Sequence, residues 1–542
     1  MGAEGWWVGV LGVVVAGGVR AWWRRRRAIS SVHWRGRALR AGDPTTWDGA
    51  GEGSGLQFGQ VRLPRRSGPG HFAYVGSTGS GKTLLQRLLI QSVVPGVGLG
   101  HGWRALVYDA KQDVLPLLAG MRPSCRVHLL HPLDARASAW DLAADVTSPS
   151  AALQVATLLI PQSNKDTNPF FANAARHLLY GVLLVALARA PGRWTLRQVL
   201  LVVRDPELLR QALESEAVTQ HLLPYFEHAG TFQNIISTVL TCTAPYETIA
   251  ASWDRAVEKV SLRAWLEEES VLVLGNDEAH RVAVDTLNRL IFQRLSELIL
   301  ARAGTGAAGV GETWLFLDEV REMGKLEGLG RLLTKSRTAG ACVVLGLQDL
   351  GGMREVYGPE VAEEILAQCN SKAVLRLNGP QTAQWAARLF GSREVLERAR
   401  SQNQSRSFRS LGLESGGSRG ESVSHGIVKR EVVLDSELLG LPETHPSTGL
   451  SAFFLSPTVG AYRDRIPGEW LSRHLVPPDP GVPGALPRPE SDQYLRPWDA
   501  GDAAAWGWGD AGEVAGEDGP PWADAPGAGT SDPEESDPHT TH

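Results

Sequence analysis

The sequence predicts an α/β fold built on a mostly parallel sheet, and three observations support this prediction. Seven short runs are predominantly apolar without alternation, as expected for strands that are buried on both faces of a sheet. Several of these runs end in a polar residue, and ligands of open α/β sheets bind at the carboxyl ends of strands. A glycine-rich loop follows the first run and precedes a helical stretch. The runs are residues 71–75, 105–108, 127–130, 271–274, 314–317, 342–347 and 373–377.

The first 30 residues predict an N-terminal transmembrane anchor. Their apolar run is flanked by tryptophan pairs at 6–7 and 22–23, a pattern typical of the aromatic belts at membrane interfaces. The run reaches about 18 residues, the lower limit of a span, only if Arg20 extends to the interface. Four arginines, 24–27, follow the second pair, so we expect a single-pass helix with the rest of the chain on the cytoplasmic side. A short interfacial helix is the alternative.

The rest of the 542-residue chain is long enough for two or three folded units. We expect residues 31–145 and 263–474 to form two parts of one α/β domain. The segment between them, 146–262, carries helical patterns and few strand signals, and it predicts an inserted all-α domain. Residues 401–426 are rich in Ser, Gly and Arg and predict a flexible loop. Residues 475–542 are rich in Pro, Gly and acidic residues and predict a disordered acidic tail.

Charge and cysteine content narrow the class of protein. The net charge is −5, but residues 497–542 hold eleven acidic residues and no Lys or Arg, so the rest of the chain carries +6. A mildly basic body is compatible with a nucleic-acid partner without requiring one. The four cysteines form no CxxC pair, which argues against a zinc ribbon or a thioredoxin-like site. The 14 histidines form no cluster of the kind that a metal-dependent DNA-nicking enzyme needs.

The glycine-rich loop fits the P-loop pattern GxxxxGK[ST] at every fixed position. Its backbone N–H groups can point at phosphate oxygens, and the following helix N-terminus adds positive potential. Lys82 can reach the β and γ phosphates of ATP, and the Thr83 hydroxyl can bind Mg²⁺. The alternative is a chance glycine-rich turn before a helix. The loop consists of Gly76, Ser77, Thr78, Gly79, Ser80, Gly81, Lys82 and Thr83.

A second motif follows the strand at 314–317, where the apolar run ends in Asp318 and Glu319. Together with the P-loop, this pair predicts a Walker B site, in which Asp318 holds Mg²⁺ and Glu319 polarises the attacking water. Gln348 ends the next predicted strand, where a RecA-like ATPase places a polar group that senses the γ-phosphate; a strand-end cap is the alternative. Residues 109–113 line the same cleft or form a polar turn.

Residues 72–471 resemble the coupling proteins of type IV secretion systems, the TraG/TraD/TrwB group of conjugation ATPases. The motifs that carry the resemblance occur in the same order as in that family. They are GSTGSGKT, LFLDEVREMGKLEGLGRLLTKSRTAGACVVLGLQDL, ILAQCNSKAVLRLNGPQTAQWAARLFG and VVLDSELLGLP. An all-α domain between the two Walker motifs also fits the family. Two features depart from it: many members have two spanning helices where this chain has one short candidate, and the acidic tail with its tryptophans has no counterpart in the family pattern.

The resemblance implies a RecA-like P-loop NTPase domain in a homo-hexameric ring at the inner membrane. It also implies ATP and Mg²⁺ as cofactors, and single-stranded DNA, a relaxase and secretion-channel components as partners. In such rings an arginine from the neighbouring subunit often completes the ATP site, and Arg337 and Arg376 are the candidates, each with a surface or ion-pairing role as its alternative. DNA contact rests on the resemblance, because no long basic cluster occurs outside 24–27.

Three functions fit these expectations. The first is a membrane-anchored ATPase that moves DNA, or relaxase-bound DNA, into a secretion channel. The second is a membrane receptor for protein cargo, in which nucleotide acts only as an assembly switch. The intact trio of Asp318, Glu319 and Gln348 favours the first, since a receptor does not need the base. The third, a double-stranded DNA pump of the chromosome-segregation type, is disfavoured by the large helical insertion.

Overall fold

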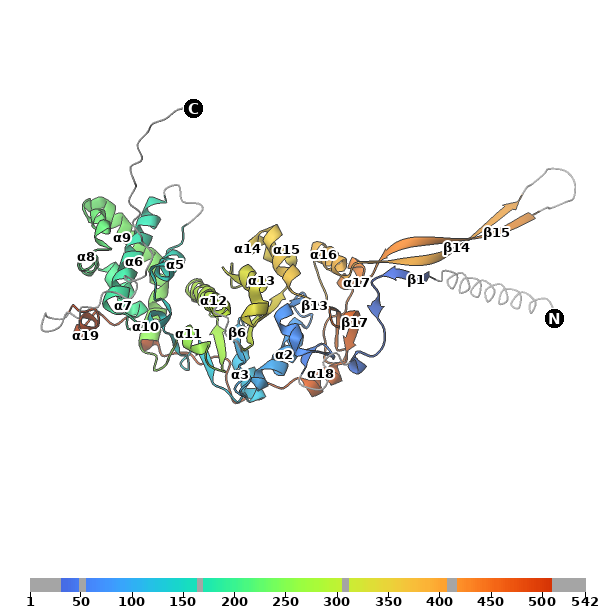
Figure 1. The fold of residues 1–542 in the computed structure, drawn as a ribbon, viewed down its shortest axis with the longest axis horizontal. Coiled ribbons are helices and arrows are strands. Elements are labelled where there is room, and N and C mark those ends of the chain that lie inside the picture. The colour runs from blue at the N-terminus through green and yellow to red at the C-terminus, as the bar shows by residue number, and fades with distance from the viewer. Residues whose placement is uncertain (1–30, 48–54, 163–168, 305–310, 407–416, 509–542) are drawn as a thin grey trace, which may run out of the picture.

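The fold is taken from a computed structural model, which describes residues 31–47, 55–162, 169–304, 311–406 and 417–508. Its centre is a ten-stranded sheet whose middle strands run parallel (Figure 1). The antiparallel pairs of this sheet, β13 with β16 and β16 with β17, lie toward one edge. In spatial order the strands are β2 (Leu39–Arg40), β17 (Gly460–Ile466), β16 (Leu450–Ser456), β13 (Ser371–Val374), β5 (Phe72–Val75), β12 (Ala341–Leu347), β11 (Thr313–Leu317), β6 (Arg104–Asp109), β10 (Val271–Gly275) and β7 (Val127–Leu130).

All seven strands predicted from apolar runs lie in this sheet, which confirms the mostly parallel α/β fold. The lack of alternation has a direct cause, because the sheet is covered on both faces. In β11, for example, Leu315 and Leu317 pack into one core, while Trp314 and Phe316 pack into the other.

Helices cover both faces of the sheet (Figure 1). One face carries α2 (Lys82–Val93), α3 (Val114–Met121) and α18 (Gly468–His474). The other face carries α12 (Arg281–Gly304), α13 (Leu329–Ala339), α14 (Leu350–Tyr357), α15 (Pro359–Gln368) and α16 (Pro380–Phe390). The short helix α17 (Asp435–Leu439) contacts α16.

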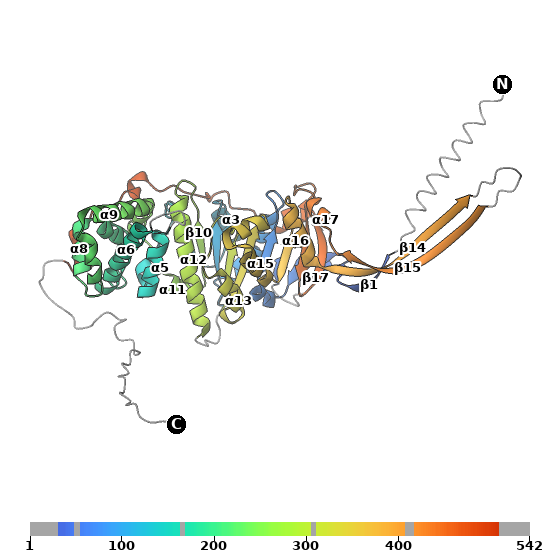
Figure 2. The same cartoon turned by 90° about the horizontal axis from the view of Figure 1, so that it is seen from above.

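Between β7 and β10 the chain forms a group of helices at one end of the molecule (Figures 1 and 2). Strand β8 (Ala139–Trp140), before these helices, pairs with β9 (Lys259–Val260), near their end, in a two-stranded sheet. Its helices are α4 (Leu142–Asp145), α5 (Pro149–Leu159), α6 (Phe170–Arg189), α7 (Leu196–Arg204), α8 (Pro206–Glu214), α9 (Ala229–Thr243), α10 (Glu247–Asp254) and α11 (Leu262–Trp265).

Helix α6 is, among the described residues, the one helix long and apolar enough to cross a membrane by length and composition. It packs against α5, α7, α8 and α9, and 67% of its most apolar window is buried inside the protein. Burial to this extent is typical of a helix in the core of a globular domain. The anchor predicted for residues 1–30 lies outside the described residues.

A long hairpin extends from the other end of the molecule (Figure 2). It is built from β14 (Ser392–Arg406) and β15 (Gly417–Glu431), and β1 (Ser31–Gly36) pairs with β14 in the same sheet. The prediction of a flexible loop over residues 401–426 is therefore wrong for the strand residues, because backbone pairing orders a stretch whose side chains show no apolar period. A small hairpin of β3 (Leu56–Phe58) and β4 (Val61–Leu63) packs into the core beside α2.

The prediction of a disordered tail over residues 475–542 is wrong for residues 475–508. These residues run along the body and end in the helix α19 (Ala500–Ala505), which lies on the helical part (Figure 1). Trp506 is fully buried there. The physical reason is a set of long-range contacts, which outweighs the local Pro- and Gly-rich composition. Residues 509–542 lie outside the described part of the chain.

Candidate nucleotide-binding site

The P-loop connects β5 to α2 at the carboxyl end of the sheet. Gly79 has φ +76° and Gly81 has φ +94°, so both adopt a backbone conformation that favours glycine. The Gly76 N–H donates to the Leu347 carbonyl at 3.1 Å, which ties the start of the loop to the end of β12. The Thr444 hydroxyl donates to the Ser80 carbonyl at 2.6 Å. The loop is thus held at both ends before any ligand binds.

The acidic pair lies against the P-loop, because β12 separates β5 from β11 by a single strand. The Lys82 ammonium lies 3.3 Å from Asp318 Oδ1 and 3.1 Å from Glu319 Oε1. The Thr83 hydroxyl donates to Asp318 Oδ2 at 3.1 Å. A hydroxyl and a carboxylate this close, next to a phosphate-binding loop, are the hard oxygen ligands that Mg²⁺ accepts together with phosphate and water.

Glu319 is buried among polar partners. Gln348 Nε2 donates to Glu319 Oε2 at 2.8 Å, and Lys111 Nζ lies 3.6 Å from Glu319 Oε1. Burial by itself raises the pKa of Glu319, but Lys82, the Gln348 hydrogen bond and Lys111 together lower it below its usual value. Glu319 also has φ +57°, a conformation that costs energy for any residue with a side chain. The carboxylate is therefore ionised and held in place.

Open volume adjoins these groups on two sides of Gln348. One cavity, of about 460 Å³, is bordered by Ser77 and Thr78 of the P-loop and by residues 377–382. A second cavity, of about 300 Å³, is bordered by Glu319, Gln348 and Arg281, the first residue of α12. A ligand seated on the P-loop would face both Glu319 and Gln348.

The two candidate arginines lie in different surroundings. The backbone carbonyl of Arg376 accepts hydrogen bonds from the Ser77 N–H at 2.9 Å and from its hydroxyl at 3.0 Å, so Arg376 lies beside the P-loop of its own chain. Its side chain pairs with Glu443 at 2.9 Å. Arg337 is exposed near the end of α13. The structure thus brings the P-loop, Asp318, Glu319 and Gln348 together with the Arg376 backbone, and leaves Arg337 on the surface.

Lys111 is a residue of the site that the sequence pattern did not single out. Asp109 accepts backbone N–H groups from Lys111 at 3.3 Å, Asp113 at 3.1 Å and Val114 at 3.2 Å, and so shapes the loop that carries Lys111. Burial and the neighbouring Asp113 raise the pKa of Asp109 to about 6. Both interpretations of residues 109–113 therefore apply: Asp109 caps a turn, and Lys111 reaches the cleft. The only sequence signal that could have pointed to Lys111 was its position just after the end of a predicted strand.

Residues 55–454 match the family of type IV secretion-system coupling proteins, in its DNA-binding domain. This chain belongs to that family. A similar curated protein is the coupling protein TraD of Escherichia coli (strain K12), which is 24% identical over 357 residues, or 64% of this chain. The matched region covers 47% of TraD, so this chain spans about half the length of that relative.

Solved structures of a member of the coupling-protein family share the fold. The plasmid coupling protein TrwB in complex with ADP and Mg²⁺ has a TM-score of 0.61 and 19% identity, covering 85% of this chain and 98% of the solved chain. The unbound monoclinic form of TrwB lacking its N-terminal segment also has a TM-score of 0.61, with 20% identity over 84% of this chain and 97% of that one. At this identity the likeness concerns the fold.

Proposed function

We propose that this chain is a membrane-anchored ATPase that moves DNA, or relaxase-bound DNA, into a type IV secretion channel. The observation that carries the proposal is the convergence of Lys82, Thr83, Asp318, Glu319 and Gln348 at the end of adjoining strands. Membership of the coupling-protein family supports DNA as the cargo. The TrwB complexes with ADP and Mg²⁺, and with a non-hydrolysable ATP analogue, support ATP and Mg²⁺ as cofactors.

Each side chain then has one task. The amides of residues 76–83 and Lys82 hold the phosphates, while Thr83 and Asp318 hold the cation. Bound Mg²⁺ would neutralise charge that develops on the γ-phosphate. Glu319 orients and polarises the attacking water, and Gln348 keeps that carboxylate in position. We assign Arg337 to the site of a neighbouring subunit and Arg376 to the site of its own chain.

The remaining features complete the proposal. Residues 1–30 form a single-pass anchor in the inner membrane, and the bulk of the chain lies in the cytoplasm. Six copies form a ring. The helical part, residues 146–262, forms an inserted all-α domain at the end of the molecule opposite β1, where it receives the relaxase or another substrate.

The test measures ATP turnover of the full-length chain with and without single-stranded DNA. We expect DNA to stimulate turnover, and Lys82→Ala to abolish both turnover and DNA transfer. Lys325→Ala is the control, because Lys325 is an exposed lysine paired with Glu327. Turnover that DNA does not change would favour the cargo-receptor function instead, and DNA transfer by Lys82→Ala would refute the motor.

A further inference from the structure

The last described residues of the chain connect the nucleotide-binding half to the helical part. Near its start, this segment is fixed to α2, the helix that follows the P-loop: the Val476 N–H donates to Gln91 Oε1 at 2.8 Å, and Arg87 donates to the Val476 carbonyl at 3.0 Å. Residues 475–499 then have little regular secondary structure apart from one 3-10 turn, η6 (Glu490–Gln493). They cross the molecule toward α7 and α10 (Figure 1).

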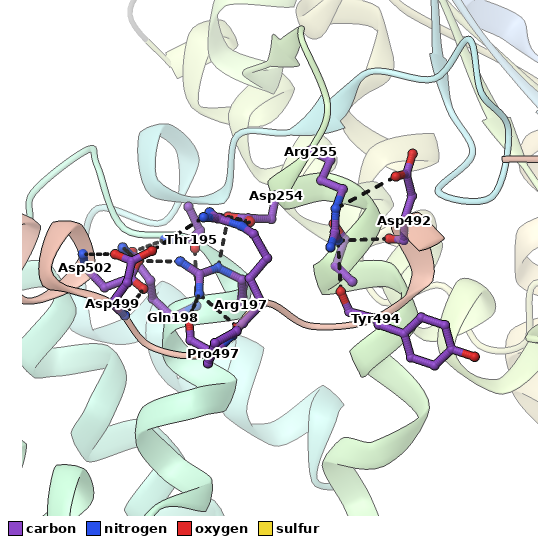
Figure 3. A network of polar contacts seen from close by, with 12 residues as sticks. Thr195, Arg197, Gln198, Asp254, Arg255, Asp492, Tyr494, Pro497, Asp499 and Asp502 are labelled. Atoms are coloured by element: carbon purple, nitrogen blue, oxygen red, sulfur yellow. Dashed lines mark hydrogen bonds and ion pairs between the residues drawn. The ribbon is translucent and has the colours of Figure 1, made fainter. Parts of the chain in front are cut away.

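At its end the segment enters a network of polar and charged side chains that links it to α7 and α10 (Figure 3). Arg197 of α7 lies 3.0 Å from Asp254 of α10, and it also contacts Asp502 of the segment. Arg496 of the segment in turn lies 2.8 Å from Asp254. Each side thus supplies one arginine and one aspartate to these contacts, and Asp499 of the segment, 3.4 Å from Arg496, adds a further carboxylate. The Arg197 guanidinium also donates to the carbonyls of Arg496 and Pro497, both at 3.1 Å.

An aromatic anchor lies beside this network. Trp506 follows α19 and is fully buried, and its indole N–H donates to Gln198 at 3.2 Å. Gln198 also donates to Asp502 at 2.8 Å. The helix α19 carries its own capping box, in which Asp499 and Asp502 accept each other's backbone N–H groups at 3.0 Å. The segment therefore presents a short capped helix that contains Asp502, and Trp506 follows four positions later, directly after the helix.

We propose that the surface of α7 and α10 is a peptide-binding site for a short capped helix carrying an aspartate and a tryptophan. In this chain residues 496–508 occupy the site in cis and act as a releasable clasp between the two halves of the molecule. The ligand class is an acidic, tryptophan-containing peptide. This inference does not depend on ATP hydrolysis.

The charge arrangement is what makes the clasp releasable. A buried ion pair that loses one partner leaves an uncompensated charge, which is strongly destabilising. Here Arg197 keeps Asp254 as its partner when the segment leaves, since both belong to the helical part. Gln198 likewise keeps its capping bond from the Thr195 N–H at 3.0 Å. On the other side, Arg496 retains Asp499, 3.4 Å away, within its own segment.

The experiment supplies the segment in trans. A fluorescently labelled peptide of residues 494–508 is titrated into the full-length chain carrying Asp502→Asn and Trp506→Ala, and into the wild-type chain. We expect the peptide to bind the double variant, whose own segment no longer fills the site, at least about tenfold more tightly than it binds the wild type. Equal binding to both chains, or binding to neither, would overturn the proposal.

Peptide variants test the recognition. An Asp502→Asn peptide should bind at least about tenfold more weakly, because it loses the charge-assisted contact with Arg197. A Tyr494→Ala peptide is the matched control, since that ring is 63% exposed, and its binding should be unchanged. Introducing Arg197→Lys into the double variant keeps the positive charge but loses the planar guanidinium group with its several donors. This change should also weaken binding of the peptide. Equal binding by the Asp502→Asn and wild-type peptides would contradict the assignment.

A measurement on the unmodified chain covers the case in which the double variant fails to fold. Backbone amides of α19 should exchange with deuterium faster than the central amides of α7, because the clasp opens while α7 stays folded. If α19 and α7 exchange only together, in one unfolding event, the segment is part of the core and the proposal fails.

Discussion

Glu319 combines burial, two nearby ammonium groups and a hydrogen bond from Gln348. The two lysines lower its pKa, so the side chain stays ionised at neutral pH and can accept a proton from water. We expect Glu319→Gln to lower the ATP turnover number about 10²-fold or more, because a neutral amide cannot act as the base. Nucleotide affinity, measured by titration calorimetry, should change little, since the P-loop is intact.

A matched carboxylate variant separates this effect from general damage. Glu355 pairs with Arg321 at 2.7 Å on the exposed surface, and Glu355→Gln should leave turnover unchanged. Full ATP turnover in Glu319→Gln would show that Glu319 is not the base that activates water.

Lys111 provides a second prediction at the residue scale, through the pH dependence of turnover. The pKa of Glu319 is lowered, so activity that needs its ionised form is complete at neutral pH and is lost only as the pH falls through that lowered value. Lys111→Ala removes one of the charges that lower the pKa, so the acidic limb of the pH–rate profile should move to higher pH. Because Lys111 is 52% exposed, solvent screens the interaction and we expect a shift below about one pH unit. Lys111→Arg should keep the original limb, and an unchanged limb in Lys111→Ala would contradict the role.

At the scale of elements, the P-loop owes its shape to glycines whose surroundings differ. A Cβ on Gly81 would lie 2.3 Å from Leu450 Cδ1 and 2.6 Å from the Thr444 hydroxyl oxygen, whereas a Cβ on Gly79 would meet nothing within 4 Å. We expect Gly81→Ala to lower the free energy of unfolding by about 2–4 kcal/mol, through backbone strain and overpacking together. Gly79→Ala should cost about 1 kcal/mol, through strain alone. Urea denaturation measures both, and equal losses would show that the contact with Leu450 does not constrain the loop.

Elements with local signals were predictable from the sequence. Strands β5 and β11 are continuous apolar runs next to P-loop and acidic motifs, and α6 has a clear helical period. Strand β17, which lies between the edge strand β2 and β16, was missed. Its buried residues only alternate with exposed ones, within a charged stretch, GAYRDRI, so it shows no continuous apolar run. Helix α19 was missed for a different reason. Its six residues are too short to be stable alone, and they are held by Arg197 and Gln198, about 300 positions earlier in the chain.

At the scale of the whole molecule, the sequence predicted the order of the parts but not how the last described residues return across them. The helical part and the hairpin of β14 and β15 lie at opposite ends of an elongated chain (Figure 2). The site lies between them, at the carboxyl ends of β5, β11 and β12. The segment that starts near Val476 contacts both α2, the helix after the P-loop, and the helical part, so it connects the two physically.

The ring itself can be tested with mixed subunits. If Arg337, which is exposed on α13, completes the site of a neighbouring copy, Lys82→Ala and Arg337→Ala subunits should each be inactive alone. In an equal mixture, an active site forms wherever an Arg337→Ala subunit supplies its P-loop and a Lys82→Ala neighbour supplies its arginine. Random assembly then restores about a quarter of the sites. Recovered ATP turnover after mixing and reassembly would place Arg337 across a subunit interface.

The control is Arg376→Ala mixed with Lys82→Ala. Because Arg376 lies beside the P-loop of its own chain, that mixture should recover no ATP turnover. Recovery in the Arg376 mixture alone would reverse the two assignments.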